Sequence, residues 1–147
     1  RAFIPSAFIF EESVRLSIYQ NILSIGSMQK LAAYSDNLNN RFGVFPNSVS
    51  LLFFLQELKI ACVESFVLSI VFLKGVASVV FLPGSHISNI QVFLNWVDVF
   101  FKDFSGEHLY KKGAGNRLVL CFDASLGDKD IYLFLLLLLN KFKQRFL

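Results

Sequence analysis

The side chains in this chain that could hold a metal ion are His86, His108, Cys62 and Cys121. Structural zinc sites bring their ligands in pairs that lie two to five residues apart. No two of these four residues have that spacing. We therefore predict no metal site. We expect one histidine at a helix start, one in a strand, and two buried free thiols in a reducing compartment.

The sequence shows no pattern typical of catalysis. Gly113-Ala114-Gly115 lacks both the third glycine and the strand-to-helix setting of a phosphate-binding loop, so it predicts a turn. Neither a Gly-x-Ser-x-Gly nucleophile motif nor a Walker A motif occurs. An enzyme should show a nucleophile with its base, a phosphate cradle or paired acids in a cleft. We predict no catalytic residue and no cofactor.

Three cations close the chain with no acid among them: Lys141, Lys143 and Arg145. Cations at the C-terminus of a helix complement the helix dipole and keep an apolar helix in solution, which is the interpretation we favour. The alternative is a tail that contacts phosphates of a nucleic acid. A second basic group, Lys111, Lys112 and Arg117, flanks a predicted hairpin tip, and we interpret it as a solvated turn.

Composition and charge indicate one apolar domain. The 147 residues are 54% hydrophobic and 17% charged, and 18 of them are phenylalanine. The net charge of +3 is mild, with five basic and five acidic residues in 1–65 and nine and six in 66–147. Proteins that bind nucleic acid usually concentrate Lys and Arg on one face, so this charge alone does not demand such a partner. Arg1 is not an initiator, and we expect a piece of a longer protein.

Hydrophobic periodicity predicts three helices in the first part of the chain. An extended lead-in over 1–10 precedes a helix over 11–25. Ser27 is expected to cap the second helix, which runs over 28–42 and ends at Gly43. Pro46 suits the first turn of a third helix, which continues to Cys62 and is apolar nearly all round.

The second part predicts strands and helices in alternation. Lys74-Gly75 joins two β-rich runs over 66–73 and 76–82 into a hairpin. A second hairpin is expected over 107–111 and 117–122. A helix between the hairpins should bury one face, made of Ile87, Ile90, Leu94, Val97 and Phe101, and a last helix should run from Asp128 to the end. The fold class is α+β, in the order ααα-ββ-α-ββ-α, with helices packed on short antiparallel hairpins or one small sheet.

The last predicted helix is apolar on every side from Ile131 to Leu139. Nine residues are about half of the ~20 that a membrane-spanning helix needs, so we predict no membrane segment. Either such a helix threads the centre of the fold or part of it docks on a neighbour, and the sequence leaves both alternatives open.

Several fragments of the first part resemble one protein family. Ala2-Phe3-Ile4-Pro5, Arg15-Leu16 with Tyr19, and 40–46 together read A-x-I-P-x-x-x-I … R-L-x-x-Y … L … R-F-G-x-x-P. This pattern resembles the C-terminal domain of the bacterial transcription-repair coupling factor, the TRCF family. The motifs cover residues 2 to about 61, and beyond them only the order of elements is similar.

The resemblance implies one TRCF-type domain over 1–147 of a larger multidomain protein. It would consist of a lead-in over 1–10, a three-helix segment over 11–62 and an α+β segment over 63–147. In that family the domain has no ATPase or nuclease activity and follows the motor modules of an ATP-dependent DNA translocase. It acts as an autoinhibitory clamp: it docks on the N-terminal UvrB-like module and masks the surface that recruits UvrA.

The same resemblance implies indirect partners and a location. UvrA, RNA polymerase and DNA would be reached through the parent protein, in the bacterial cytoplasm and without a membrane. The alternative function is an accessory nucleic-acid-contacting module that uses the basic helix end at Lys141, Lys143 and Arg145.

This chain departs from the family at one motif, which usually reads E-x-x-D-R-F-G. Asn37 and Asn40 replace the two acids, and Asp36 is the nearby carboxylate. We predict that Asp36, Asn37, Asn40 and Arg41 form the interdomain contact. Each lost charge-assisted hydrogen bond is worth roughly 1.5–3 kcal/mol when well made, so the charged part of the clamp should be weaker here or be carried by other residues. Leu16 and Tyr19 should lie on the core side of their helix, and Arg15 and Arg41 are candidate ion-pair partners within the scaffold.

Overall fold

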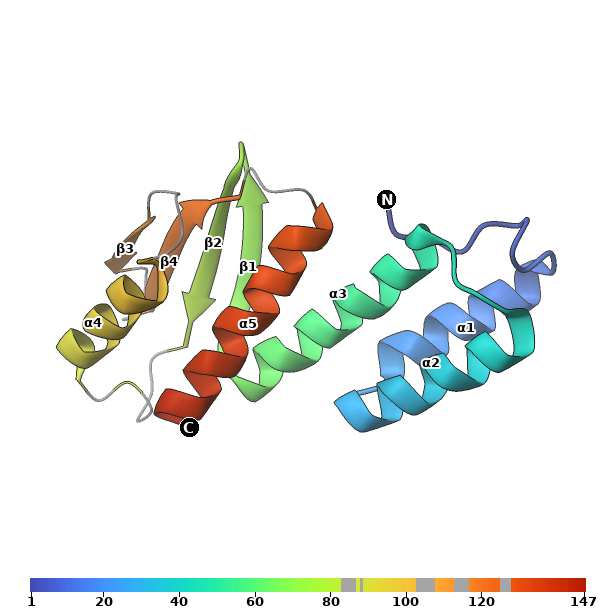
Figure 1. Cartoon of the computed structure of the whole chain (residues 1–147), viewed down its shortest axis with the longest axis horizontal. Coiled ribbons are helices and arrows are strands. Elements are labelled where there is room, and N and C mark those ends of the chain that lie inside the picture. The colour runs from blue at the N-terminus through green and yellow to red at the C-terminus, as the bar shows by residue number, and fades with distance from the viewer. Residues whose placement is uncertain (83–86, 88, 103–107, 113–116, 125–127) are drawn as a thin grey trace. The chain divides into compact units, whose positions relative to one another are not determined.

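Five helices and four strands form over the residues that the computed structural model describes, which are 1–82, 87, 89–102, 108–112, 117–124 and 128–147 (Figure 1). The elements are α1 (Glu12–Ser24), α2 (Met28–Phe42), α3 (Asn47–Glu64), β1 (Val67–Leu73), β2 (Val76–Phe81), α4 (Ile90–Phe100), β3 (His108–Lys112), β4 (Leu118–Asp123) and α5 (Asp128–Phe146). The α+β class and the order ααα-ββ-α-ββ-α are confirmed. The chain divides into two compact units, Arg1–Ile60 and Ala61–Leu147.

The first unit is built on the predicted helical stripes. Ile18 and Ile22 of α1 and Leu31 and Leu38 of α2 are buried in one cluster. Ser27 caps α2 as expected, since its Oγ accepts the Lys30 amide at 3.3 Å. Gly43 ends α2 with φ +88°, a conformation that costs glycine least.

The expectation that Leu16 lies on the core side of α1 is wrong, because 55% of this residue is exposed. Ile18 and Ile22 lie four residues apart and set the buried line of the helix. A residue two positions before Ile18 is rotated by about 200° and therefore points away from that line. Tyr19 is half-buried and packs against the core, as predicted.

The strands of the second unit form one antiparallel sheet in the order β1-β2-β4-β3. Lys74 and Gly75 have φ of 50° and 75°, as in the type I′ turn whose twist suits a two-residue hairpin. Of the two alternatives, separate hairpins or one small sheet, the structure shows one sheet. The pairing of β2 with β4 joins the two predicted hairpins.

Helices α4 and α5 lie on the same face of the sheet (Figure 1). The rings of Phe93 in α4 and Phe142 in α5 lie 5.4 and 4.8 Å from that of Phe81 in β2, between centroids. The strand residues that point toward the helices are buried: Ala77, Val79, Phe81, Leu118, Leu120 and Phe122.

The predicted buried face of α4 is partly wrong. Val97 and Phe101 are buried as expected, but the fully buried residue is Phe93, and Ile90 is 40% exposed. The sequence contains two overlapping stripes, and the one with Phe93 carries the larger aromatic area toward the sheet. Because buried apolar area drives the packing, the helix turns that stripe inward.

Helix α5 buries one side and exposes another, so it does not thread the centre of the fold, and docking of its exposed side on a neighbour stays a prediction. The buried side holds Ile131, Leu135, Leu138, Leu139 and Phe142. On the other side Leu133 and Leu137 are 46% and 50% exposed. Among the described residues, none of the helices combines the length and the hydropathy that a membrane span requires.

Leucines on the two sides of α5 should differ in their effect on stability. Leu135→Ala removes a side chain with 0% exposure and should lower the free energy of unfolding by about 2–5 kcal/mol. Leu133→Ala changes the same residue type in the same helix at an exposed position and should cost less than about 1 kcal/mol. Urea unfolding followed by circular dichroism measures both, and equal losses would contradict the assignment of the buried side.

Candidate functional site

The residues first considered for metal binding or catalysis are separated in the structure. No three His, Cys, Asp or Glu side chains among the described residues are grouped to hold a metal ion. His86 and Gly113-Ala114-Gly115 lie outside the described residues. Both cysteines are free, and burial raises the pKa of Cys62 to about 11. At neutral pH Cys62 is therefore a thiol rather than the thiolate that acts as a ligand or nucleophile.

His108 has a structural explanation. Its Nε2 lies 3.0 Å from Asp98 Oδ1, and its ring stacks on Phe101 with 4.6 Å between centroids. Both contacts connect β3 with α4 or its C-cap. The histidine thus helps to hold an edge strand against the helix layer.

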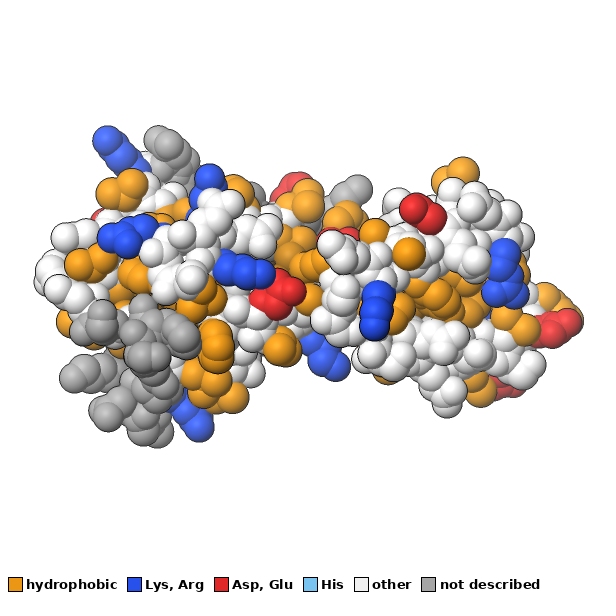
Figure 2. Space-filling view, turned by 90° about the horizontal axis from the view of Figure 1, so that it is seen from below, with side chains coloured by type: hydrophobic (Ala, Val, Ile, Leu, Met, Phe, Trp, Pro, Cys, Tyr) orange, Lys and Arg blue, Asp and Glu red, His pale blue; other side chains and the backbone are white. Residues whose placement is uncertain are grey.

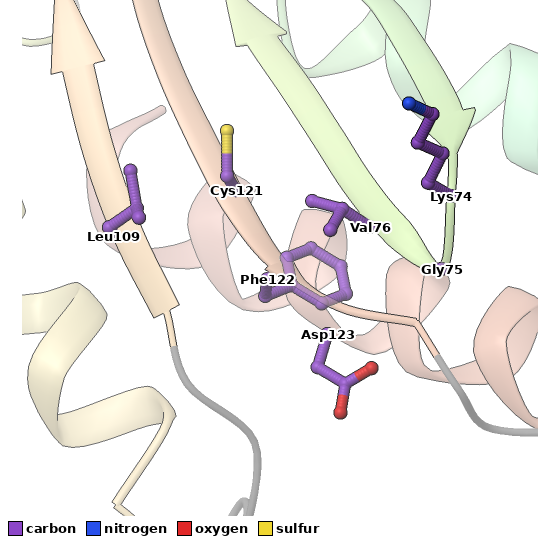
Figure 3. A pocket seen from close by; sticks show the side chains of 7 residues that line it. All are labelled: Lys74, Gly75, Val76, Leu109, Cys121, Phe122 and Asp123. Carbon is purple, nitrogen blue, oxygen red and sulfur yellow. The ribbon is translucent and has the colours of Figure 1, made fainter.

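A shallow hollow of about 540 Å³ lies on the sheet and is lined by Lys74, Gly75, Val76, Leu109, Cys121, Phe122 and Asp123 (Figure 3). Cys121 Sγ is 3.4 Å from Ser78 Oγ, and a hydroxyl cannot act as the base that a thiol nucleophile needs. The charged lining residues are one lysine and one aspartate from strand ends and turns. The hollow is an apolar depression of the sheet surface and not a reaction centre.

The four predicted contact residues lie together on an exposed side of α2. Asp36, Asn37, Asn40 and Arg41 are all exposed. The other three follow Asp36 by one, four and five residues, which places all four on one arc of the helix, away from the buried Leu38. We call these four residues the α2 polar face. None of their side chains makes a hydrogen bond or an ion pair with another described residue.

Arg41 occupies a defined position at the end of this face. Its Cζ lies 4.9 Å from the ring centroid of Phe42, and a cation in the last turn of α2 complements the helix dipole. Arg41 also borders a hollow of about 240 Å³ that is lined by α1 and α2. At this hollow Asn21 Nδ2 donates to the Tyr34 hydroxyl at 3.1 Å. The guanidinium therefore stands at a polar, solvent-facing edge of the helix pair.

Arg15, the other arginine of the family-like motifs, belongs to the scaffold. Its Nη1 donates to the carbonyl oxygens of Ile9 and Phe10 at 2.8 and 2.7 Å. The Tyr19 hydroxyl accepts the Ile4 amide at 2.6 Å. These bonds fasten the lead-in to α1. Sequence reasoning expected a carboxylate partner for Arg15, and backbone carbonyls leave no pattern that would have identified them.

The basic end of α5 does not form one patch. Lys143 Nζ pairs with Glu64 Oε2 at 2.9 Å. Lys141 and Arg145 are four residues apart on one side of the helix, while Lys143 is rotated by about 200° from Lys141. On the face shown in Figure 2, Lys and Arg side chains are spaced apart rather than gathered. This arrangement fits the dipole and solubility interpretation better than a phosphate-binding tail.

Two comparisons with known proteins identify similar molecules. Residues 1–92 match the family model of the TRCF domain. A solved structure described as the crystal structure of the C-terminal domain of transcription-repair coupling factor superposes with a TM-score of 0.78. It is 19% identical, and the superposition covers 97% of this chain and 89% of that one, so it supports the fold. Comparison with curated proteins gave no match.

Substitution of the two arginines in the family-like motifs, Arg15 and Arg41, should lower stability by different amounts. Arg15→Met removes two hydrogen bonds from a half-buried cation to carbonyls and should cost about 1–2 kcal/mol of unfolding free energy. Arg41→Met is the matched control and should cost less, about 0.5–1 kcal/mol, because this exposed guanidinium makes no hydrogen bond with the described residues and contributes through the helix dipole and the Phe42 ring. Urea titration of both variants measures the difference. Equal effects would remove the distinction between scaffold and surface arginine.

Proposed function

Since the chain belongs to the TRCF domain family, we propose that it is the regulatory, non-catalytic C-terminal domain of a transcription-repair coupling factor and docks on the N-terminal UvrB-like module of the same protein. Docking would mask the surface that recruits UvrA, and release would expose it. The family match supports this proposal, and so does the likeness in fold to a solved domain of such a factor.

The docking proposal rests on one observation: some residues of the family-like motifs hold the scaffold together, whereas others are exposed and have no such role. Ile4, Arg15 and Tyr19 are engaged in holding the lead-in to α1. Gly43 supplies a helix end. The α2 polar face is exposed and makes no hydrogen bond or ion pair with the described residues, so its groups are available to a partner.

The chemistry of this face indicates how docking would work. Arg41 offers a planar guanidinium that can bind a carboxylate with two parallel hydrogen bonds. Asn37 and Asn40 offer amides, which donate and accept but carry no charge. Compared with the family pattern of two acids, the face loses two negative charges. We infer that arginine on the partner contributes less here and that docking is less sensitive to salt.

The role of this domain in the cell would depend on the other modules of the multidomain protein to which we assign it. The motor modules of an ATP-dependent DNA translocase would supply contact with DNA and RNA polymerase, and this domain would set when UvrA is recruited. We place the whole protein in the bacterial cytoplasm. The accessory nucleic-acid function stays the second candidate; the divergent directions of Lys141 and Lys143 weigh against it.

Removal of the exposed arginine should weaken docking. Arg41→Met should lower the affinity for the isolated UvrB-like module of the parent about tenfold, which corresponds to the loss of one charge-assisted contact. Isothermal titration calorimetry measures this. Lys30→Met removes an exposed cation from the first turn of the same helix and should leave the affinity unchanged. No binding by the unaltered chain, or an equal loss in both variants, would overturn the proposed face.

Restoration of the two acids should strengthen docking. Asn37→Glu with Asn40→Asp recreates the family pattern and should tighten binding of the same module about tenfold, with a steeper salt dependence. Asn140→Asp with Gln144→Glu is the charge-matched control, because it adds two acids to exposed positions of α5. Unchanged affinity in the first variant would sink the idea that these asparagines weaken the contact.

A further inference from the structure

The two outer strands of the sheet differ in how they are protected. β3 (His-Leu-Tyr-Lys-Lys) and β1 (Val-Leu-Ser-Ile-Val-Phe-Leu) are the edges of the sheet order β1-β2-β4-β3. Proteins keep sheet edges from pairing with other chains by charge, proline or a bulge. β3 contains Lys111 and Lys112, whereas β1 contains no charged residue and no proline. Its one irregularity lies between Val67 and Ser69, which leaves 70–73 as a regular, unprotected edge.

Hairpin geometry determines which backbone groups this edge presents. In a two-residue hairpin the residues that flank the turn exchange both backbone hydrogen bonds, and along the strands such pairs alternate with non-hydrogen-bonded ones. The flanking pair here is Leu73 and Val76, so Val71 also faces β2. The amides and carbonyls of Ile70 and Phe72 therefore point outward. Neither residue makes a further backbone hydrogen bond with the described part of the chain.

The side chains beside these groups are apolar and exposed. Val71, Phe72 and Leu73 are 50%, 45% and 67% exposed. The register places Val71 and Leu73 on the sheet face opposite the helices, together with Val76, which is 40% exposed. Phe72 lies on the helix side, where its ring meets Tyr132 at 6.1 Å. The edge thus combines open hydrogen-bonding groups with an uncharged apolar border.

We propose that β1 is a homodimerisation edge, at which it pairs antiparallel with β1 of a second copy of this chain. Around a twofold axis through Val71, the outward groups of Ile70 would meet those of Phe72 of the second copy, and the reverse pair would form by symmetry. These two pairs would make four hydrogen bonds and join two four-stranded sheets into one of eight strands.

A second copy fits this edge for reasons of charge and symmetry. Like charges directly opposite each other destabilise a strand pair, and β1 has none to repel its own copy. The pairing is isologous, so it closes at two copies, and the charged β3 edges remain at the outside of the joined sheet.

The expected affinity is modest. Two paired strands bury less area than a standard protein interface, so a dissociation constant on the order of 10–100 µM is expected. The edge lies in the second unit, and the proposal is independent of the α2 polar face in the first.

Sedimentation equilibrium of the 147-residue chain tests the proposal together with a backbone-specific variant. The unaltered chain should shift from 16.7 kDa to twice that mass as its concentration rises to about 1 mM. Ile70→Pro removes an outward amide without breaking a bond to β2, and should weaken dimerisation at least tenfold. Ile70→Ala keeps the amide and should still dimerise. A monomer at every concentration, open-ended aggregation, or a dimer that survives Ile70→Pro would overturn the proposal.

A cross-link gives a second test that does not depend on the folding of the proline variant. In the proposed register Val71 faces Val71 of the second copy in a non-hydrogen-bonded pair, where side chains are closest. Val71→Cys should therefore form a disulfide-linked dimer under mild oxidation, located by peptide mass mapping against the native Cys62 and Cys121. Val76→Cys is equally placed on the open face but one strand inward. Equal cross-linking of both variants, or none at position 71, would contradict the register.

Discussion

The ring of Phe142 is the contact on which the second unit depends. It is 1% exposed, and its centroid lies 4.8 Å from that of Phe81 in β2 and 5.9 Å from that of Trp96 in α4. One side chain of α5 therefore touches the sheet and the other helix at once. Tilted and edge-on arrangements of such rings add about 0.5–1.5 kcal/mol each beyond the area that they bury. The unusual phenylalanine content of the chain becomes understandable here, because these rings fill the layer between helices and sheet.

The same packing leaves the sheet one-sided. Both helices lie on the face of Phe81 and Phe122, and neither of them covers the opposite face. Antiparallel sheets tolerate one face in water when that face is polar. Here it contains Val71, Leu73 and Val76, together with the apolar hollow near Cys121. Lys74 and Asp123 line the hollow, but the part of this face next to the uncharged β1 edge is apolar. That part gives the second unit a surface suited to association.

Much of the fold was predictable from the sequence because its signals are local. Ser27 and Gly43 mark the ends of α2 in the sequence, and Lys74-Gly75 marks the hairpin. The pairing of β2 with β4 was not predictable, because it joins segments about 40 residues apart and leaves no local pattern. The prediction of the buried side of α4 is partly wrong, because two apolar stripes overlap in this helix. Packing against the sheet selects the stripe with Phe93. The sequence identified the residues of the candidate site. It could not show that Arg15 binds backbone carbonyl oxygens, because carbonyl acceptors leave no pattern in a sequence.

The placement of the motif residues explains how fold and docking can vary separately. A change at Arg15 or Tyr19 alters hydrogen bonds that hold the lead-in, so these positions are tied to stability. A change between Asn and an acid at positions 37 and 40 occurs on an exposed helix surface, where substitutions usually alter stability by less than about 0.5 kcal/mol. The same change alters the charge offered to a partner. A likeness in fold at 19% identity therefore carries the scaffold, whereas the strength of the docking that we propose would depend on the chemistry of the α2 polar face.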